Sequence, residues 1–370
     1  MLLNRLPSQL FKSTLKSNSI INLTCVKCSD FSKPDIGRFN IIKKCIYGFI
    51  FSGVVVTSYY ARQAIEKKSE ILKEAIRLNN KIGRMTLYKF RDFILPEEVL
   101  PVIKQLPEIK FNSDDVILST FPKTGVTWLQ EIIWLIMNDY NFDKALLTNL
   151  EDRFPFLEWI LPGISAINKK QSPRLVKTHL PLSILFNQET KIEPKVISIT
   201  RNIKDVTVSY YFFARMNKLV DYQESIEMFV ERFVAGNIAY GPLHRHYIDT
   251  LKYSTVDGNK VLIVAYEDLH NDFEGSVKRL CTFLGKPFPS DETMVQLKKH
   301  CDFRFMKVNP MVNYSHWDGI GLRNLNESQF FRAGKVGDWS NHLSKPCSEL
   351  LDDYYELHFR GLFNFKETID

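Results

Sequence analysis

The chain has 370 residues, of which 45% are apolar and 13% aromatic, so it can bury a large core and line a pocket for an apolar ligand. Its formal net charge is +7, but residues 1–44 alone carry eight Lys and Arg against two Asp. The rest of the chain is close to neutral, which argues against a nucleic-acid partner and requires any anion site to be local.

The first segment of the chain, residues 1–44, is a basic tail. Its first thirty residues have no acid before Asp30, and in composition they resemble a mitochondrial presequence, with a disordered basic arm as the alternative. Residues 45–61 carry no charge and reach the short end of the roughly 17–25 residues that span a bilayer. A membrane anchor and a buried or interfacial helix both stay open for this segment, because Ser, Thr, Gly and Tyr dilute its apolarity.

Residues 62–84 predict a charged linker helix. Glu66, Glu70 and Glu74 recur at every fourth position among Lys and Arg, which is the spacing of one helix face. An irregular lead-in is expected at 93–114, where prolines and turn signals interrupt apolar residues. The catalytic domain is therefore expected over residues 85–370.

Cysteines and histidines indicate no metal or disulfide framework. The six cysteines are scattered, and the eight histidines form no cluster in the sequence. Cys25 and Cys28 have metal or redox spacing, but no second pair of ligands lies nearby. Reduced thiols and the absence of a bound metal are the expectation.

An anion-binding unit is predicted at 115–128. Residues 116–121 indicate a buried strand, 122–125 a tight loop, and a helix rich in Leu, Ile and Trp starts at Val126 and ends near 138–141. A strand, loop and helix in this order form a phosphate cradle, because the main-chain N–H groups and the dipole at a helix start favour an anion. The nucleotide-triphosphate P-loop pattern does not fit, since Lys123 precedes the only glycine.

Three more apolar runs, at 174–179, 195–201 and 261–267, each end in a polar or charged residue. Helix-like stretches separate them, which predicts an α/β fold with one domain and a central, mainly parallel sheet covered by helices on both faces. Ligands of such sheets bind outside the carboxyl ends of the strands. Lys123, His179, Arg201 and Tyr266 should therefore converge at one edge.

The sequence Thr-Phe-Pro-Lys-Thr-Gly-Val-Thr-Trp at 120–128 resembles the 5′-phosphosulfate loop of the cytosolic sulfotransferase family. Four further segments resemble the family's motifs in the same order, at 177–181, 201–211, 266–269 and 332–339. The resemblance implies transfer of a sulfuryl group from the co-substrate 3′-phosphoadenosine 5′-phosphosulfate (PAPS) to the hydroxyl of a small lipophilic acceptor, such as a phenol or steroid. No metal is implied.

Three residues would carry the chemistry. The resemblance assigns the general base to His179, whose reference pKa of about 6.5 suits proton abstraction near neutral pH. Lys123 would stabilise the leaving phosphate oxygen, and Lys177, two residues before His179 on the same strand, would stabilise charge on the transferred group.

The resemblance also assigns the two binding regions. Donor binding falls to Lys123, Thr124, Gly125, Val126, Thr127, Trp128, Arg201, Ser209, Tyr266, Cys301, Phe303, Phe331, Arg332, Ala333 and Gly334. The acceptor pocket falls to Phe154, Phe156, Phe212 and Phe213. The alternatives are an ion pair with Asp205 for Arg201 and an ordinary core position for Trp128 and each phenylalanine.

Some positions depart from the family pattern. Val126 replaces a hydroxyl residue in the loop, and Ala333 replaces a lysine, which weakens the 3′-phosphate clamp unless Lys335 compensates. The family's short dimer motif is degenerate at 340–349, so dimerisation is not carried over.

Two other functions stay open. One is a PAPS- or PAP-binding protein with little catalysis, motivated by Val126 and Ala333. The other is a membrane-anchored lumenal carbohydrate sulfotransferase. Its support is the hydrophobic segment at 45–61 and the glycosylation sequons at Asn22, Asn313 and Asn326. The cytoplasmic face is the expected location, with or without a membrane anchor, and mitochondria are the alternative.

Overall fold

The structure is a computed structural model that describes residues 74–158, 163–186, 193–256, 258 and 260–365. All of these residues belong to one compact unit, Ala64–Asp370. The predicted basic tail at 1–44 and the hydrophobic segment at 45–61 lie outside the described residues and stay predictions. None of the helices in the described part of the chain combines the length and the apolarity that crossing a bilayer requires.

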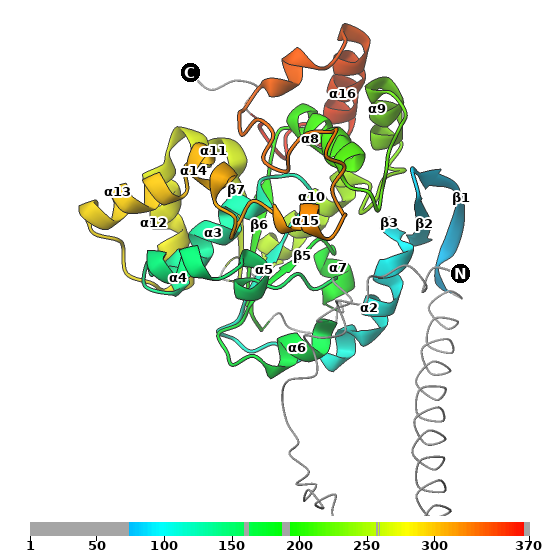
Figure 1. The fold of residues 1–370 in the computed structure, drawn as a ribbon. Coiled ribbons are helices and arrows are strands. Elements are labelled where there is room, and N and C mark those ends of the chain that lie inside the picture. The colour runs from blue at the N-terminus through cyan, green and yellow to red at the C-terminus, as the bar shows by residue number, and fades with distance from the viewer. Residues whose placement is uncertain (1–73, 159–162, 187–192, 257, 259, 366–370) are drawn as a thin grey trace, which may run out of the picture. The chain divides into compact units, whose positions relative to one another are not determined.

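A four-stranded parallel sheet lies at the centre of this unit (Figure 1). Its strands are β4 (Val116–Ser119), β5 (Leu175–Thr178), β6 (Lys195–Thr200) and β7 (Val261–Ala265), in the spatial order β5-β4-β6-β7. The register places Val116 opposite Leu175 on one side and Lys195 on the other, so the carboxyl ends of the strands meet at one edge. The predicted α/β fold and its four strands are confirmed.

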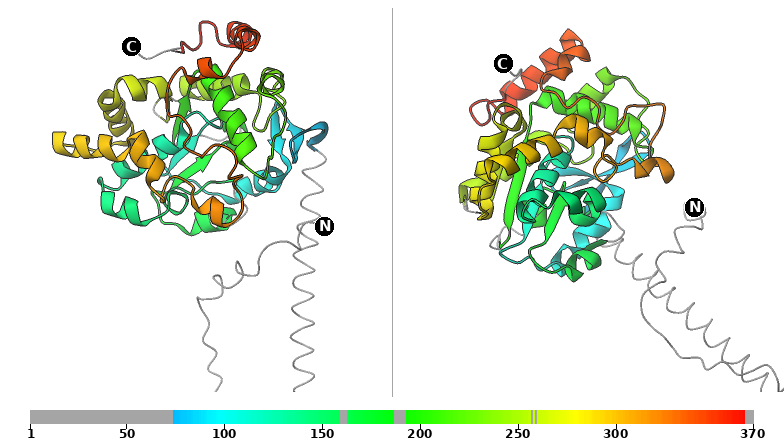
Figure 2. Two further views of the ribbon diagram at one scale, coloured as in Figure 1. Left: turned by 45° about the horizontal axis from the view of Figure 1, so that its top comes forward. Right: turned by 60° about the vertical axis from the view of Figure 1, so that its left-hand side comes forward.

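Both faces of the parallel sheet are buried, which explains why its strands read as continuous apolar runs. Alternate residues of β4 pack in different hydrophobic clusters, with Ile117 in one and Val116 and Leu118 in the other. Helices α3 (Val126–Met137) and α12 (Phe273–Leu284) cover the second face. Helices α8 (Ile203–Met216), α9 (Ile226–Val234), α10 (Leu243–Val256) and α16 (Lys345–His358) contribute to the first cluster, and the two layers can be followed in Figure 2.

The other helices are short and connect these layers. They are η1 (Glu97–Val99), α2 (Leu100–Gln105), η2 (Leu106–Glu108), α4 (Phe142–Leu147), α5 (Leu150–Arg153), α6 (Gly163–Lys169), α7 (Leu182–Leu185), α11 (Tyr266–Asn271), α13 (Asp291–His300), α14 (Phe303–Val308), α15 (His316–Gly319) and η3 (Asp338–Asn341). Helix α3 starts at Val126 and its C-cap is Asn138, as the sequence predicts. The predicted lead-in at 93–114 consists of a short strand followed by η1, α2 and η2.

A second, antiparallel sheet corrects the predicted start of the domain. Its strands are β1 (Ile76–Ile82), β2 (Met85–Phe90) and β3 (Phe93–Pro96). The prediction of a linker helix up to residue 84 and of a domain that starts at 85 is wrong for residues 76–84, because β1 pairs with β2. The periodic glutamates end at Glu74, so the helical pattern has no bearing on the residues that follow. Residues 62–73 lie outside the described residues.

The turn between β1 and β2 is packed against the loop that follows α8. Gly83 has a φ of +55°, and the main-chain N–H of Arg84 donates to the carbonyl oxygen of Val220 at 2.7 Å. A Cβ at Gly83 would lie 2.0 Å from that same oxygen. The turn therefore needs glycine for both its conformation and its close approach.

We predict that Gly83→Ala lowers the free energy of unfolding by about 3 kcal/mol, from the left-handed backbone and the clash together. Gly321→Ala is the matched control, since φ there is +71° but no described atom lies within 4 Å of an added Cβ. It should lose only about 1 kcal/mol. Urea unfolding followed by tryptophan fluorescence measures both, and equal losses would contradict the packing of the turn.

Candidate active site

The loop between β4 and α3 is shaped to hold an anion. Gly125 precedes α3 with a φ of +106°, and a Cβ there would lie 2.5 Å from Cδ2 of Tyr266. Only glycine allows this close approach. The helix start has no side-chain cap, so its first turn offers main-chain donors and the positive end of the dipole to a ligand.

The neighbours of Gly125 use their side chains within the protein. The hydroxyl of Thr124 donates to the carbonyl oxygen of Phe121 at 2.9 Å. The hydroxyl of Thr127 is hydrogen-bonded to Tyr314. Val126 is buried in the core cluster around α3. Any contact of these three residues with a donor phosphate would therefore use their main-chain N–H groups.

Lys123 carries the positive charge of the loop in a mostly apolar setting. Its Nζ lies 4.6 Å from the ring centre of Phe213 and 4.4 Å from that of Phe330. Burial, and then the positive charges of Lys177, Arg201 and Arg332, together lower the pKa of Lys123 to about 7. Four basic side chains thus gather at this edge, of which Lys123 and Arg201 belong to the predicted convergence of the strand ends. An anion with several charges would relieve their repulsion.

Arg201 follows β6 and joins two loops. Its guanidinium donates to the carbonyl oxygens of Lys123 at 3.3 Å and of Lys335 at 2.9 Å, and its Cζ lies 4.2 Å from the ring centre of Tyr266. The alternative ion pair with Asp205 exists, with an N–O distance of 3.7 Å. The Nε of Arg201 is buried without a hydrogen-bond partner in the described part of the chain. It is therefore available to a bound anion.

Aromatic rings form a second region beside the loop. Trp128 contacts Tyr266, His270 and Phe273, with ring centres 5.7, 4.8 and 6.2 Å apart. Its Nε1 is buried and lacks a hydrogen-bond partner among the described residues. The ring of Trp128 packs on that of Tyr266, which lies next to Gly125. Both rings therefore belong to the hydrophobic core and also border the anion loop.

The segment after residue 329 closes over the loops. Phe331 contacts Phe303, with ring centres 5.8 Å apart, and a Cβ at Gly334 would lie 2.0 Å from that same ring. Cys301 is buried, which holds the pKa of its thiol well above the ordinary value and leaves it unreactive. These predicted donor residues therefore lie side by side.

Arg332 reaches the same place from this segment. It pairs with Asp338 at 2.6 Å and lies over the ring of Phe212 at 4.6 Å. Ala333 adds no charge beside it, and Lys335 is exposed while its carbonyl oxygen accepts from Arg201. The contact between Lys335 and Arg201 is thus made by the main-chain carbonyl group of Lys335.

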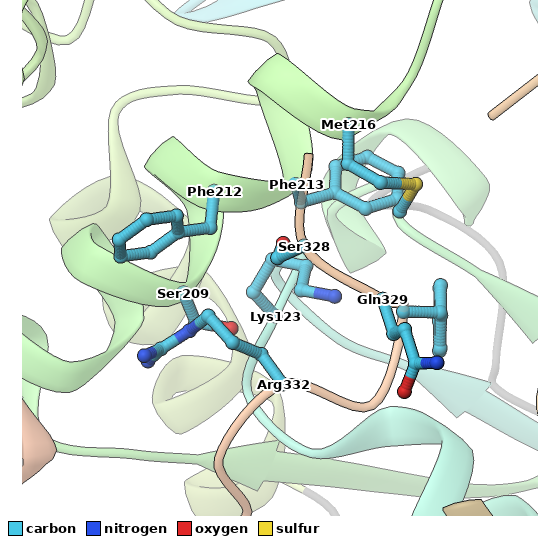
Figure 3. A pocket seen from close by; sticks show the side chains of 9 residues that line it. Lys123, Ser209, Phe212, Phe213, Met216, Ser328, Gln329 and Arg332 are labelled. Atoms are coloured by element: carbon cyan, nitrogen blue, oxygen red, sulfur yellow. The ribbon is translucent and has the colours of Figure 1, made fainter. Parts of the chain in front are cut away.

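A pocket opens between α8 and this segment (Figure 3). It is lined by Lys123, Ser209, Phe212, Phe213, Met216, Ser328, Gln329, Phe330 and Arg332. Met216, Ser328, Gln329 and Phe330 were not foreseen from the sequence. Helical spacing from Ser209 and Phe213 points to Met216, and Phe330 directly precedes Phe331, a predicted donor residue, so the sequence carried a signal for both.

His179 lies just beyond β5 and is buried. Its Nδ1 is 2.8 Å from the carbonyl oxygen of Thr120, so Nδ1 carries the proton and Nε2 is unprotonated. Burial, and then the charge of Lys177, hold the pKa of His179 well below its ordinary value. The imidazole is neutral at pH 7 and able to accept a proton.

Lys177 and two aromatic rings surround His179. The ring of Phe156 lies 5.1 Å from that of His179, and the ring of Tyr240 lies 5.3 Å away on ring-centre distances. The Nζ of Lys177 is 4.4 Å from the ring centre of Phe156. Burial lowers the pKa of Lys177 to about 8, so this side chain is mostly charged at neutral pH.

The four predicted acceptor phenylalanines divide among three places, and Phe212 and Phe213 share the pocket of Figure 3. Phe156 lies beside His179, Phe213 beside Lys123, and Phe212 beside Arg332. Phe154 has no exposed surface and packs in the core cluster of α3. In this structure Phe154, the C-cap of α5, thus occupies the core position that the sequence left open as its alternative.

The residues present fit an anionic nucleotide. Arg201 Nε and Trp128 Nε1 are buried polar atoms without partners among the described residues, and such atoms are usually paired in proteins. A charged phosphate and a nucleobase supply acceptors for them. Within the described ranges, no group of three or more His, Cys, Asp or Glu side chains could hold a metal ion.

Comparisons with known proteins agree with this geometry. A family model described as a sulfotransferase domain matches residues 113–363. Sulfotransferase 1E1 of Bos taurus is 34% identical over 285 residues, which cover 76% of this chain and 92% of that protein. Sulfotransferase 1B1 of Canis lupus familiaris is 35% identical over 263 residues, which cover 70% of this chain and 88% of that protein.

A solved structure shares the fold. It is the crystal structure of retinol dehydratase in complex with androsterone and the inactive cofactor PAP, with a TM-score of 0.69 and 22% sequence identity. The match covers 81% of this chain and 95% of that chain. The parallel sheet and its covering helices are thus an arrangement found in known proteins.

We predict that binding of 3′-phosphoadenosine 5′-phosphate (PAP) takes up protons at pH 8. With a pKa of about 7, Lys123 is mostly neutral there, and a bound anion favours its charged form. Calorimetry in Hepes and in Tris should show uptake on the order of 0.5–1 proton and weaker binding as the pH rises from 7 to 9.

Two variants identify the group that takes up the proton. Lys123→Met should lose most of the proton uptake on PAP binding. The matched Lys177→Met should still take up the protons that bind to Lys123. Equal uptake in Lys123→Met and the parent would contradict the assignment.

Proposed function

Because the chain belongs to the sulfotransferase family, we propose that His179 is the general base that deprotonates the acceptor hydroxyl. The chain is a PAPS-dependent sulfotransferase that acts on a small acceptor. One observation carries the assignment of the base. The hydrogen bond from Nδ1 to the carbonyl oxygen of Thr120 fixes the tautomer in which Nε2 accepts a proton.

The two lysines are proposed to stabilise charge on the reacting groups. PAPS supplies the electron-poor sulfuryl group when it is bound, so catalysis is mainly positioning and charge stabilisation. Lys123 belongs to the anion loop and would stabilise the leaving phosphate oxygen. The Nζ of Lys177 lies 4.4 Å from the ring centre of Phe156 and its charge acts on His179, so its ammonium group would stabilise the group in transfer.

Donor binding is proposed for the residues gathered around the loop. Arg201 and Ser209 would hold the 3′-phosphate, together with Arg332 and Gly334. Trp128 and Tyr266 would contact the adenine, with Phe331 and Phe303 next to it. The remaining members of the set are Thr124, Gly125, Val126, Thr127, Cys301 and Ala333. The Arg201 Nε and Trp128 Nε1 atoms, which lack hydrogen-bond partners among the residues that the structure describes, support this assignment.

The proposed acceptor is a lipophilic alcohol or phenol. The rings of Phe213 and Phe330 lie beside Lys123, and that of Phe156 lies beside His179, so an apolar body would pack on them while its hydroxyl meets the base. Ser328 and Gln329 add two polar groups to the pocket. Met216 gives it an adaptable wall.

A PAP-binding protein with little catalysis is the second function. The uncharged Ala333 beside Arg332 favours it, because Lys335 offers Arg201 only its carbonyl oxygen. Lumenal carbohydrate sulfation, membrane association and location stay predictions, since residues 1–61, which bear on an anchor, lie outside the described residues. Dimerisation stays open, because the family's dimer motif is degenerate at 340–349.

We predict that His179→Ala lowers kcat about 1,000-fold and leaves the Kd for PAP within about twofold. Labelled PAPS with a panel of phenols and alcohols measures turnover, and calorimetry measures PAP binding. His316→Ala is the control, because His316 pairs with Glu151 on the outside of the domain. Unchanged turnover in His179→Ala would refute the base, and PAP binding by the parent without turnover of any acceptor would favour the second function.

A further inference from the structure

A short segment pairs with the end of the strand that carries the two proposed catalytic residues. The N–H of Lys177 donates to the carbonyl oxygen of Pro155 at 2.9 Å, and the N–H of Leu157 donates to that of Lys177 at 2.8 Å. In a regular parallel ladder, the carbonyl oxygen of Leu157 would accept next, from the N–H of His179. In this structure, the N–H of His179 instead donates to Oε1 of Glu158 at 2.5 Å.

The carboxylate of Glu158 is deeply buried. The residue is only 6% exposed, which leaves its charge little contact with water. The Thr178 hydroxyl also bonds the carboxylate, but Oε2 is buried without a hydrogen-bond partner in the described part of the chain. Burial raises the pKa of Glu158 to about 7. A charge in such a place is costly unless an opposite charge compensates for it.

The compensating charge is Lys177. Each of the two groups shifts the pKa of the other toward the charged form. Burial disfavours the ammonium group, and Glu158 is the foremost group that opposes this effect. A main-chain carbonyl would satisfy the N–H of His179 equally well, so the hydrogen bond alone does not explain a charged side chain here.

We propose that Glu158 is a positioning residue, which fixes the main chain of His179 and keeps the ammonium group of Lys177 charged during catalysis. This inference rests on the proposed function, because it assumes that Lys177 and His179 act on the reacting groups. The carboxylate touches neither acceptor nor donor in this role. It acts through its two neighbours.

Other ionisable groups surround the pair. Those coupled to Lys177, Glu158 or His179 are Lys123, Glu151, Tyr240 and His246. Glu151 is the other carboxylate that favours charge on Lys177. It is 26% exposed and pairs with His316 at 2.9 Å, so solvent screens it more strongly than Glu158. Glu151 therefore offers a matched control.

Glu158→Gln keeps an acceptor for the N–H of His179 and removes the charge. The pKa of Lys177 should fall by about one unit, because the opposite charge beside it is gone. The alkaline limb of the pH profile of kcat should therefore move to lower pH by about one unit. The Kd for PAP should stay within about twofold. Glu158→Asp keeps the charge and should leave the limb in place, and Glu151→Gln should shift it less than Glu158→Gln does.

A second measurement reads Lys177 without turnover. NMR titration of protein with ¹³C-labelled lysine gives its pKa directly, and Lys177→Met identifies the signal. We expect a lower pKa for Lys177 in Glu158→Gln than in the parent. An unchanged value, or loss of folding in both Glu158 variants, would leave a purely structural role and overturn the proposal. Turnover by His179→Ala together with the expected shift would refute the base alone.

Discussion

The gathering of four basic side chains around the anion loop is the constraint on which this site depends; Arg201 is buried and the other three are half-buried. Lys123, Lys177, Arg201 and Arg332 are close enough that the other three lower the pKa of Lys123, after burial itself. Such a cluster does not assemble by attraction, so packing must hold it in place. The aromatic rings do this for the two lysines, since ammonium groups are attracted to ring faces even where water is excluded. Because the fold already holds these positive charges together, a bound anion gains their attraction without having to bring them together.

The loops are tied together by contacts between distant parts of the chain. Asp205, in the first turn of α8, accepts from the N–H groups of Gly337 and Trp339 at 2.8 and 3.1 Å. Arg201 donates to main-chain oxygens of both the anion loop and the C-terminal segment. Because the C-terminal segment takes part in both links through its main chain, they do not depend on its side chains, such as the one missing at Ala333. The clamp therefore keeps its shape although one charge is absent.

The sequence predicts what short-range patterns determine. The four parallel strands and the start of α3 are found because apolar runs, a proline and a glycine mark them locally. The role of Glu158 could not be read, since it depends on pairing between residues 155–157 and Lys177 across the sheet. The error at β1 has another cause, because the helical spacing of the glutamates, which ends at Glu74, was extended to residue 84 over residues that pair with β2. Phe154 and Phe156 are the same residue type two positions apart, and the sequence does not reveal that one lies in the core cluster of α3 and the other beside His179.

Burial acts alike on Lys177 and His179, yet it gives them opposite charge states. It lowers both pKa values, but lysine starts from 10.5 and histidine from 6.5. The same loss of water therefore leaves the lysine mostly charged, with a pKa of about 8, and makes the histidine neutral. A neutral base and a charged lysine can therefore lie two residues apart at the end of one strand, although burial shields both side chains from water. The lysine retains only a narrow margin above neutral pH, which is why a single buried carboxylate at Glu158 matters there.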